Sequence, residues 1–449
     1  MTVIYCVSDF RHEMQVITQV FFAHAKYVFC GEIPVKGLAV RGTSSVAEVY
    51  EDGALLASVA VGAETDVKRG VMLALFYALE EVTGKAPPWG ALTGVRPSKQ
   101  VRLWLEDGES EDTIAKRLGG VYHLREDKIR LAVEVARAEG RMILAQKPGV
   151  GVYVGIPFCP SRCLYCSFVT FQKTGKDVHG RYLAALAREY ERADANAVYI
   201  GGGTPTAFSA PDFERLLNLV GIFPGVEYTV EAGRPDSITK EKLELMKAYG
   251  VTRIAINPQT LNDSTLERIG RAHTARDFFK AYELARQAGF DNINVDIIAG
   301  LPGEGASEME RTMDGLKSLA PAHITVHTLA VKRASLLNEL RSEYEISGEI
   351  DKMLTIADET CRGLGLSPYY MYRQKNQAGG FENVGYARAG CECAYNIAMM
   401  AETGTVLGFG AGAVTKTLTG SLITRKFNPK EVETYIERMN NDDASTKRD

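Results

Sequence analysis

The sequence lacks the features that mark membrane, secreted and nucleic-acid-binding proteins. It has no uncharged apolar run of roughly 18 residues, the length that a transmembrane helix needs. No basic stretch precedes an apolar one between Met1 and Arg11, so we expect no secretory signal. Lys and Arg total 52 against 56 Asp and Glu, a net charge of −4, which argues against a general nucleic-acid-binding surface. We therefore expect a cytoplasmic protein with no membrane span and no nucleic-acid partner.

Length and composition indicate a globular protein of several domains. The chain has 449 residues, enough for two or three domains at roughly 100–200 residues each. Hydrophobic residues make up 45% and charged residues 24%, which is ordinary for a folded protein and argues against long disorder. No internal repeat or low-complexity segment interrupts the chain.

Before residue 150 the sequence predicts a small α+β domain and then a helical region. Residues 16–29 and 46–61 are rich in Val, Phe, Tyr and Ala, as short strands and hairpins are. Asp66 begins a helical pattern that Gly84 ends. We expect an N-terminal domain over residues 1–85, either a substrate or partner domain or a packing module.

A break in the chain separates this domain from the helical region. Pro87, Pro88 and Gly90 disfavour regular helix, and residues 98–146 then follow a helical pattern. We expect residues 86–149 to form a linker and helical region.

From residue 150 the pattern changes to short apolar runs separated by helical stretches. Such alternation predicts β/α units and a parallel sheet with both faces covered. Six units are too few for an ordinary eight-fold barrel, so the expected fold class is α/β, with a partial (β/α)6 barrel over residues 150–330. The predicted strands are 152–156, 197–200, 228–230, 253–256, 293–298 and 323–328.

The remaining residues, 331–449, have a mixed pattern and are expected to form a C-terminal α/β extension that covers the substrate. The predicted elements are a helix at 349–363, strands at 369–376 and 405–409, a short helix at 432–439 and a frayed polar tail at 440–449.

Three of the eight cysteines lie together directly after the first barrel strand. Cys159, Cys163 and Cys166 have the spacing C-x3-C-x2-C. Three thiolates on one loop suit three irons of a cubane and leave the fourth iron open to another ligand. A zinc site and three unrelated buried thiols are the alternatives, but no matching Cys-x2-Cys pair occurs elsewhere to complete a zinc site.

Further polar and glycine-rich segments follow the other predicted strands. Because chemistry in β/α barrels sits at the carboxyl ends of the strands, we expect these segments to share one rim. Each residue taken alone is equally compatible with a structural cap or an exposed surface position. The segments are Gly201-Gly202-Gly203-Thr204-Pro205, Glu231-Ala232-Gly233-Arg234-Pro235, Asn257-Pro258-Gln259, Gly270-Arg271-Ala272-His273, Asp296 with Gly300-Leu301-Pro302-Gly303, and His327 with Lys332 and Arg333.

This set of motifs resembles the radical S-adenosylmethionine (SAM) superfamily and, within it, the oxygen-independent coproporphyrinogen III oxidase (dehydrogenase) family, most closely the branch called HemZ. The resemblance covers roughly residues 88–415. It also includes Ile156-Pro157-Phe158-Cys159 and three segments outside the rim: Thr93-Gly94-Val95-Arg96-Pro97, Tyr369-Tyr370-Met371-Tyr372-Arg373-Gln374-Lys375-Asn376 and Glu382-Asn383-Val384-Gly385-Tyr386.

The resemblance implies a [4Fe-4S] cluster on Cys159, Cys163 and Cys166, with SAM bound to the open iron. It implies that an electron from the cluster cleaves the sulfonium and that the resulting 5′-deoxyadenosyl radical removes hydrogen from a substrate carbon. An electron donor such as flavodoxin or ferredoxin is implied as a partner. The SAM-binding residues it implies are Tyr153, Gly202, Gly203, Thr204, Glu231, Gln259, Arg271 and Asp296.

The substrate that the resemblance implies is a tetrapyrrole, coproporphyrinogen III, two of whose propionates are oxidatively decarboxylated to give protoporphyrinogen IX in heme biosynthesis. Cations suit the propionates. The candidates are Arg234, Lys332, Arg333, Arg373 and Lys375. Radical opening or methylation of heme is a second enzymatic hypothesis, and non-catalytic heme binding or trafficking is a third.

Three positions differ from better-known relatives. Position 168 is Phe where the dehydrogenases carry a fourth Cys, and position 155 is Gly where they carry His. Glu382 occupies the first position of a His-Asn-x-x-Tyr motif that the heme-chaperone branch uses for heme, which argues against an iron ligand of that kind here.

Cys391 and Cys393 form a second close pair of cysteines. Only three cysteines and no His lie beyond residue 328, so this part of the chain cannot hold a second cubane by itself. We therefore expect one cluster per chain.

Overall fold

The structure is a computed structural model that describes residues 2–22, 25–62, 66–146, 149–168, 177–332, 334–340, 348–374, 377–420 and 422–446. The chain divides into two compact units. The first comprises Met1–Arg137 with Met371–Glu382, and the second Ala138–Tyr370 with Asn383–Asp449. The four-segment domain division stays a prediction.

The first unit contains a five-stranded sheet in the order β2-β1-β3-β4-β5. Its elements are β1 (Val3–Ser8), α1 (Arg11–Phe21), β2 (Lys26–Phe29), β3 (Leu38–Gly42), β4 (Val46–Glu51), β5 (Ala54–Ala60) and α2 (Val67–Thr83). The predicted hairpin at 46–61 is confirmed, as is the helix that Asp66 and Gly84 bound. The strand prediction at 16–29 is wrong over residues 16–21. They belong to α1, because Met14, Ile17 and Phe21 recur at helical spacing and are buried.

Three further helices follow in the predicted helical region. They are α3 (Pro97–Glu106), α4 (Glu111–Gly120) and α5 (Glu126–Ala145). The segment Met371–Glu382 contributes the short helix η3 (Ala378–Gly380) to the first unit.

The second unit is built on six neighbouring parallel strands, as the sequence predicts. They are β6 (Val150–Ile156), β7 (Ala195–Gly202), β8 (Glu227–Glu231), β9 (Arg253–Ala255), β10 (Ile293–Ala299) and β11 (His323–Thr328). Their apolar side chains are almost completely buried, for example Val154, Ile200 and Val295 at 0% exposure. All six carboxyl ends therefore lie at the same edge of the sheet.

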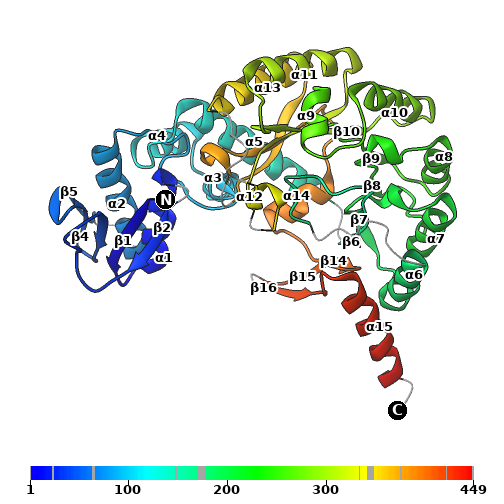
Figure 1. Ribbon diagram of the computed structural model, residues 1–449, viewed down its shortest axis with the longest axis horizontal. Helices are drawn as coiled ribbons and strands as arrows, with labels where there is room; N and C mark the ends of the chain where they lie inside the picture. The colour runs from blue at the N-terminus through cyan, green and yellow to red at the C-terminus, as the bar shows by residue number, and fades with distance from the viewer. Residues whose placement is uncertain are drawn as a thin grey trace. The chain divides into compact units, whose positions relative to one another are not determined.

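Helices connect these strands and, in Figure 1, α6, α7, α8, α10 and α11 form the layer outside them. The helices are α6 (Val178–Glu189), η1 (Pro205–Ala207), α7 (Ala210–Val220), η2 (Pro235–Ser237), α8 (Lys240–Ala248), α9 (Asp263–Arg268), α10 (Ala275–Gln287) and α11 (Ala306–Leu319). This alternation of strand and helix confirms the α/β class.

Five more strands extend the sheet at its two ends, giving the order β12-β13-β11-β10-β9-β8-β7-β6-β14-β15-β16. The sheet is open, as a partial barrel requires. The additional elements are α12 (Leu336–Glu339), α13 (Ile350–Gly363), β12 (Ser367–Tyr372), β13 (Asn383–Ala387), α14 (Ala394–Ala401), β14 (Val406–Phe409), β15 (Val414–Thr419), β16 (Leu422–Phe427) and α15 (Val432–Thr446).

The C-terminal predictions are confirmed in part. The helix at 349–363 and the strand at 405–409 agree with α13 and β14, whereas β12 ends at Tyr372. Residues 375 and 376 of that predicted strand lie outside the described residues. The prediction that the last helix ends at 439 is wrong, because α15 continues to Thr446. No helix in the described ranges is long and apolar enough to cross a membrane.

A carboxylate on α6 ties the C-terminal elements to the barrel. Glu189 accepts hydrogen bonds from the amide of Gly410 at 2.7 Å, from the Asn428 side chain at 2.6 Å and from the Tyr435 hydroxyl at 2.7 Å. Replacing this carboxylate leaves all three donors without their acceptor.

We predict that Glu189→Ala lowers the free energy of unfolding by about 1–3 kcal/mol, the usual cost of unsatisfied buried donors. Urea unfolding followed by circular dichroism measures it. Glu433→Ala is the matched control, because Glu433 pairs with Arg181 across the same two helices but is exposed. That variant should lose less than about 1 kcal/mol. Equal losses of unfolding free energy in the two variants would contradict the stabilising role assigned to Glu189.

Candidate functional site

The site begins where the end of β7 packs against the Cys loop. The amide of Gly203 donates to the carbonyl of Ile156 at 2.7 Å, and the amide of Thr204 to that of Phe158 at 2.7 Å. A Cβ atom at position 203 would lie 2.5 Å from the Phe158 carbonyl oxygen and 3.1 Å from Sγ of Cys159. Only glycine permits this approach, which holds the Cys loop on the rim.

The three thiols of the loop have different surroundings. Sγ of Cys159 lies 3.4 Å from the Thr204 hydroxyl, and burial raises the pKa of this thiol to about 11. Burial also raises the pKa of Cys166, and Lys332 and Arg162 oppose the rise. Cys163 is 8% exposed and faces two guanidinium groups. Within the described ranges no three His, Cys, Asp or Glu side chains converge on a single metal ion. A cubane does not require this convergence, because each of its irons takes one thiolate.

Beside the loop, Glu231 at the end of β8 is the centre of a first polar group. Its carboxylate accepts from the Tyr199 hydroxyl at 2.6 Å and from the amide of Gly202 at 3.2 Å. Burial raises the pKa of this carboxyl to about 7, and the Tyr199 hydrogen bond opposes the rise. A Cβ at Gly201 would lie 2.8 Å from the Glu231 carboxyl carbon, so a larger residue there would displace the Glu231 side chain.

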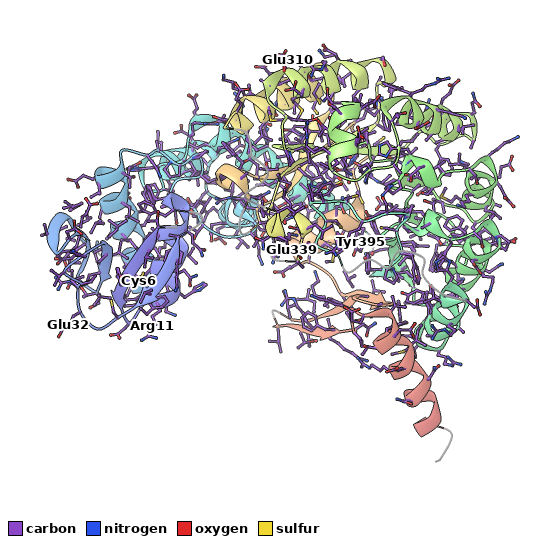
Figure 2. All side chains as sticks on the ribbon, in the orientation of Figure 1. Cys6, Arg11, Glu32, Glu310, Glu339 and Tyr395 are labelled. Carbon is purple, nitrogen blue, oxygen red and sulfur yellow. The ribbon has the colours of Figure 1, made fainter. Side chains whose placement is uncertain are left out.

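Three stacked tyrosines line the same part of the barrel. The ring centroid of Tyr199 lies 4.5 Å from that of Tyr395 and 6.3 Å from that of Tyr153. Tyr395, labelled in Figure 2, comes from the start of α14. Of the three, the sequence reasoning found only Tyr153, because nothing in the chain marks that α14 packs against β7.

Asp296 of β10 is the centre of a second polar group. Its carboxylate accepts from the Asn257 side chain at 2.9 Å and from that of Asn294 at 2.6 Å, and lies 3.5 Å from Nε2 of His327. Burial opposes ionisation of Asp296, but the hydrogen bonds outweigh it and lower its pKa. Gln259 lies nearby in the left-handed region at φ +70°, where its amide donates to the Asp296 carbonyl at 3.0 Å. The structure thus brings Gln259 and Asp296 together.

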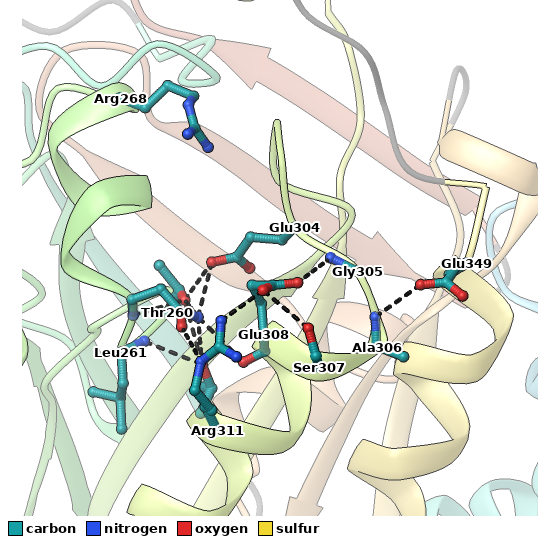
Figure 3. A network of polar contacts seen from close by, with 12 residues as sticks. Thr260, Leu261, Arg268, Glu304, Gly305, Ala306, Ser307, Glu308, Arg311 and Glu349 are labelled. Atoms are coloured by element: carbon teal, nitrogen blue, oxygen red, sulfur yellow. Dashed lines mark hydrogen bonds and ion pairs between the residues drawn. The ribbon is translucent and has the colours of Figure 1, made fainter.

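A carboxylate that follows β10 accepts hydrogen bonds from the loop that carries Gln259. Glu304 is 3% exposed and accepts from the Thr260 hydroxyl at 2.6 Å and from the Asn262 amide at 3.1 Å (Figure 3). Burial raises the pKa of Glu304, and these hydrogen bonds oppose the rise. Arg268 in the same view donates to the carbonyl of Pro302 at 2.6 Å.

Arg271 lies on the same rim, next to the Cys loop. One terminal nitrogen donates to the carbonyls of Gly233, at 3.1 Å, and Asn257, and the other lies 3.9 Å from Sγ of Cys163. Its Nε is buried and has no hydrogen-bond partner among the described residues. A buried guanidinium nitrogen without an acceptor fits a ligand carboxylate.

Of the five residues predicted for the substrate, the structure describes Arg234, Lys332 and Arg373. Arg234 is 2% exposed and is bound by Asp236, with a further contact to Ser161. Arg373 lies in the first unit, where it donates to the carbonyls of Leu92 and Gly380, both at 2.9 Å. Lys332 lies near Cys166. Arg333 and Lys375 lie outside the described residues.

Cys393 lies at the opposite end of β8 from Glu231. Its thiol donates to Glu227 at 3.3 Å, and the same carboxylate accepts from the amides of Ala394 and Tyr395. Cys393 therefore belongs to the junction that begins α14.

Comparisons with known proteins agree with this site. The pattern of the radical SAM superfamily matches residues 153–316. The oxygen-independent coproporphyrinogen-III oxidase-like protein HemZ of Bacillus subtilis (strain 168) is 38% identical over 396 residues, which cover 83% of this chain and 79% of that protein. The chain belongs to the radical SAM superfamily and, within it, to the HemZ-like branch of the coproporphyrinogen III oxidase family.

Two further relatives extend the comparison. The heme chaperone HemW of B. subtilis (strain 168) is 32% identical over 277 residues, 58% of this chain and 69% of that protein. The solved structure of coproporphyrinogen III oxidase (HemN) from Escherichia coli aligns with a TM-score of 0.52 at 21% identity, over 68% of this chain and 72% of that one. The alignment with HemN shows a shared fold.

The cofactors of this radical SAM protein are a [4Fe-4S] cluster and SAM. The residues present fit them: three thiols on one loop, a glycine that lets the end of β7 lie against that loop, and a buried Nε of Arg271 that has no partner in the described part of the chain. Cys159, Cys163 and Cys166 would hold the cluster, and Glu231, Arg271 and Asp296 would hold polar groups of SAM.

We predict that Cys163→Ala abolishes both the optical absorbance of the cluster and the cleavage of SAM, because a thiolate ligand is lost. Iron analysis after anaerobic reconstitution and chromatography of the products measure the two. Near-normal iron together with near-normal cleavage in this variant would contradict the ligand assignment.

Replacing both Cys391 and Cys393 with Ala should leave the iron count at about four per chain.

We also predict that SAM binds more tightly as the pH rises through about 7, since only the ionised form of Glu231 attracts an ammonium group. Titration calorimetry from pH 6 to 8 measures it. Glu231→Gln should bind more weakly above pH 7 and lose the step attributed to this carboxyl, whereas Glu433→Gln on α15 should keep the wild-type profile. A Glu231→Gln profile parallel to the wild type would show that another group titrates.

Proposed function

We propose that this protein is a radical SAM oxidoreductase that acts on a tetrapyrrole and oxidatively decarboxylates coproporphyrinogen III to protoporphyrinogen IX. The names of its relatives support the substrate class, because HemZ is described as coproporphyrinogen-III oxidase-like. The ligand loop and the polar groups around it support the radical chemistry.

The observation that carries the proposal is the position of Lys332 beside the cluster loop. The chain directly after Lys332 contacts that loop: the Ala334 carbonyl accepts from Arg162 at 2.8 Å, and the Leu337 amide donates to the Leu164 carbonyl at 2.8 Å. Burial lowers the pKa of the Lys332 ammonium, and Cys166 opposes the fall. Among the described residues no carboxylate pairs with it, and Ser335 binds only its backbone carbonyl. A partly buried cation next to the cluster ligands suits one propionate of the substrate.

The residues on the rim have separate tasks in this reaction. When bound, the cluster and SAM supply a carbon-centred radical that removes a hydrogen atom from the substrate. Glu231 and Arg271 bind polar groups at one side of the pocket, and Gln259 and Asp296 at the other. Lys332 holds a propionate close to the Cys loop, and the stacked tyrosines exclude water.

A heme-trafficking role is the principal rival, because HemW relatives are described as heme chaperones. Glu382 stands at the position of the heme-binding His in that branch. Its carboxylate accepts from the Trp89 indole at 2.6 Å and from Lys128 at 2.6 Å, and only 2% of the residue is exposed. These contacts occupy the carboxylate and disfavour heme ligation there.

Two further expectations belong to this proposal. A flavodoxin or ferredoxin would supply the electron, and the protein would act in the cytoplasm in heme biosynthesis. Both stay predictions.

An anaerobic assay of the reconstituted protein with coproporphyrinogen III, SAM and a reductant tests the function. We expect a tetrapyrrole product that has lost two molecules of CO2, detected by mass spectrometry, and no such product with Cys163→Ala. Ring-opened or methylated products from heme would favour the second enzymatic hypothesis. Tight heme binding without any tetrapyrrole product would favour trafficking.

We predict that Lys332→Met slows tetrapyrrole turnover at least tenfold, because a lost charged hydrogen bond typically costs about 1.5–3 kcal/mol. Cleavage of SAM without substrate should change less than twofold. Lys352→Met is the control, since Lys352 is an exposed cation on α13 that pairs with Glu349. An equal fall in both activities of Lys332→Met would assign the lysine to the cofactor site.

A further inference from the structure

Two arginine guanidinium groups contact the Sγ atom of Cys163. A terminal nitrogen of Arg234 and a terminal nitrogen of Arg271 each lie 3.9 Å from its Sγ, at N–H···S contact. Both arginines are less than 10% exposed. By contrast, the contact of Cys159 is with the neutral Thr204 hydroxyl.

The Arg234 guanidinium is held in a fixed orientation. Nε donates to one oxygen of Asp236 and Nη2 to the other, both at 2.9 Å. The remaining nitrogen, Nη1, donates to the Ser161 hydroxyl at 2.9 Å and points at Cys163. Planar pairing of this kind leaves little rotational freedom, so the N–H group stays aimed at the sulfur.

The Arg271 guanidinium approaches the same sulfur from another strand end. It is anchored to the carbonyls of Gly233 and Asn257, which are neutral acceptors. In the described part of the chain it pairs with no carboxylate, so its charge is not neutralised by direct contact. Cys163 is therefore contacted by two cations: Arg234, which pairs with Asp236, and Arg271, which pairs with no described carboxylate.

We propose that Arg234 and Arg271 raise the reduction potential of the cluster through Cys163, as positioning residues for electron entry. A one-electron reduction by a flavodoxin- or ferredoxin-type donor adds one negative charge to the cluster. Cations and N–H donors at a ligand sulfur stabilise that extra charge more than they stabilise the oxidised cluster. Burial strengthens the effect because the surroundings have a low dielectric constant. Arg234 thus serves the cluster rather than a substrate propionate.

The midpoint potential of the reconstituted full-length protein, titrated without SAM or substrate and followed by electron paramagnetic resonance, tests this inference. Arg234→Gln should shift the potential downward, because a cation is lost. Asp236→Asn should shift it upward, because the Arg234 charge loses its counter-ion. The matched controls are Arg215→Gln and Asp212→Asn, a pair on the outer helix α7 that should leave the potential unchanged.

Opposite shifts in the two variants, each with about four irons, support the inference. Unchanged potentials, or shifts of the same sign, overturn it and assign Arg234 to loop packing alone. If Arg234→Gln fails to retain its cluster, Asp236→Asn decides by itself: an upward shift supports the inference, and any other result overturns it. Because no tetrapyrrole is present, the outcome is independent of the proposed reaction.

Discussion

The approach of the end of β7 to the Cys loop is the contact on which the rest of the site depends. At Gly203 no side chain fits, since a Cβ would lie 2.5 Å from the Phe158 carbonyl oxygen. At Gly201 a Cβ would lie 2.7 Å from the Tyr199 ring and 2.8 Å from the Glu231 carboxyl carbon. These two glycines let three adjacent strand ends bring the Cys loop, the backbone amides and a carboxylate together. A larger residue at position 203 would push the end of β7 away from the Cys loop.

Inside the barrel, buried polar groups connect the rim to the opposite end of the strands. Arg253 at the start of β9 contacts Nε2 of His323 at 2.9 Å, and Nδ1 of His323 lies 2.8 Å from the Asn294 side-chain oxygen. Asn294 in turn donates to Asp296 at 2.6 Å. Burial lowers the pKa of His323, which keeps the ring neutral and able to accept from Arg253 while it donates to Asn294. The orientation of Asp296 is therefore fixed by side chains well below the rim.

The barrel could be predicted from the sequence, and the cluster loop could be placed at the end of its first strand, because both follow from local patterns. Six apolar runs separated by helices predict the six parallel strands, and the Cys spacing predicts the cluster loop. The partners of Arg234 were not predictable, because Asp236 is two residues away but Ser161 and Cys163 belong to another strand end. The role of α14 in placing Tyr395 depends in the same way on contacts between distant parts of the chain.

The structure also explains why position 155 is Gly where the dehydrogenases carry His. A Cβ at this position would lie 3.1 Å from the Ala411 carbonyl oxygen, and one at Gly410 would lie 2.4 Å from the Gly155 carbonyl oxygen. The loop after β14 therefore occupies the space that a histidine side chain would need. The pattern of residues in the chain reveals the difference from relatives, and the packing of β14 against β6 explains it.

We propose that this site delivers a radical to a propionate side chain of a tetrapyrrole. Conversion of a propionate to a vinyl group releases CO2 and removes one hydrogen from the carbon next to the ring. Coproporphyrinogen III deuterated at that carbon, incubated anaerobically with the reconstituted protein, SAM and a reductant, tests this transfer directly. We expect the 5′-deoxyadenosine recovered to carry deuterium. Unlabelled 5′-deoxyadenosine, formed while the tetrapyrrole stays intact, would contradict it.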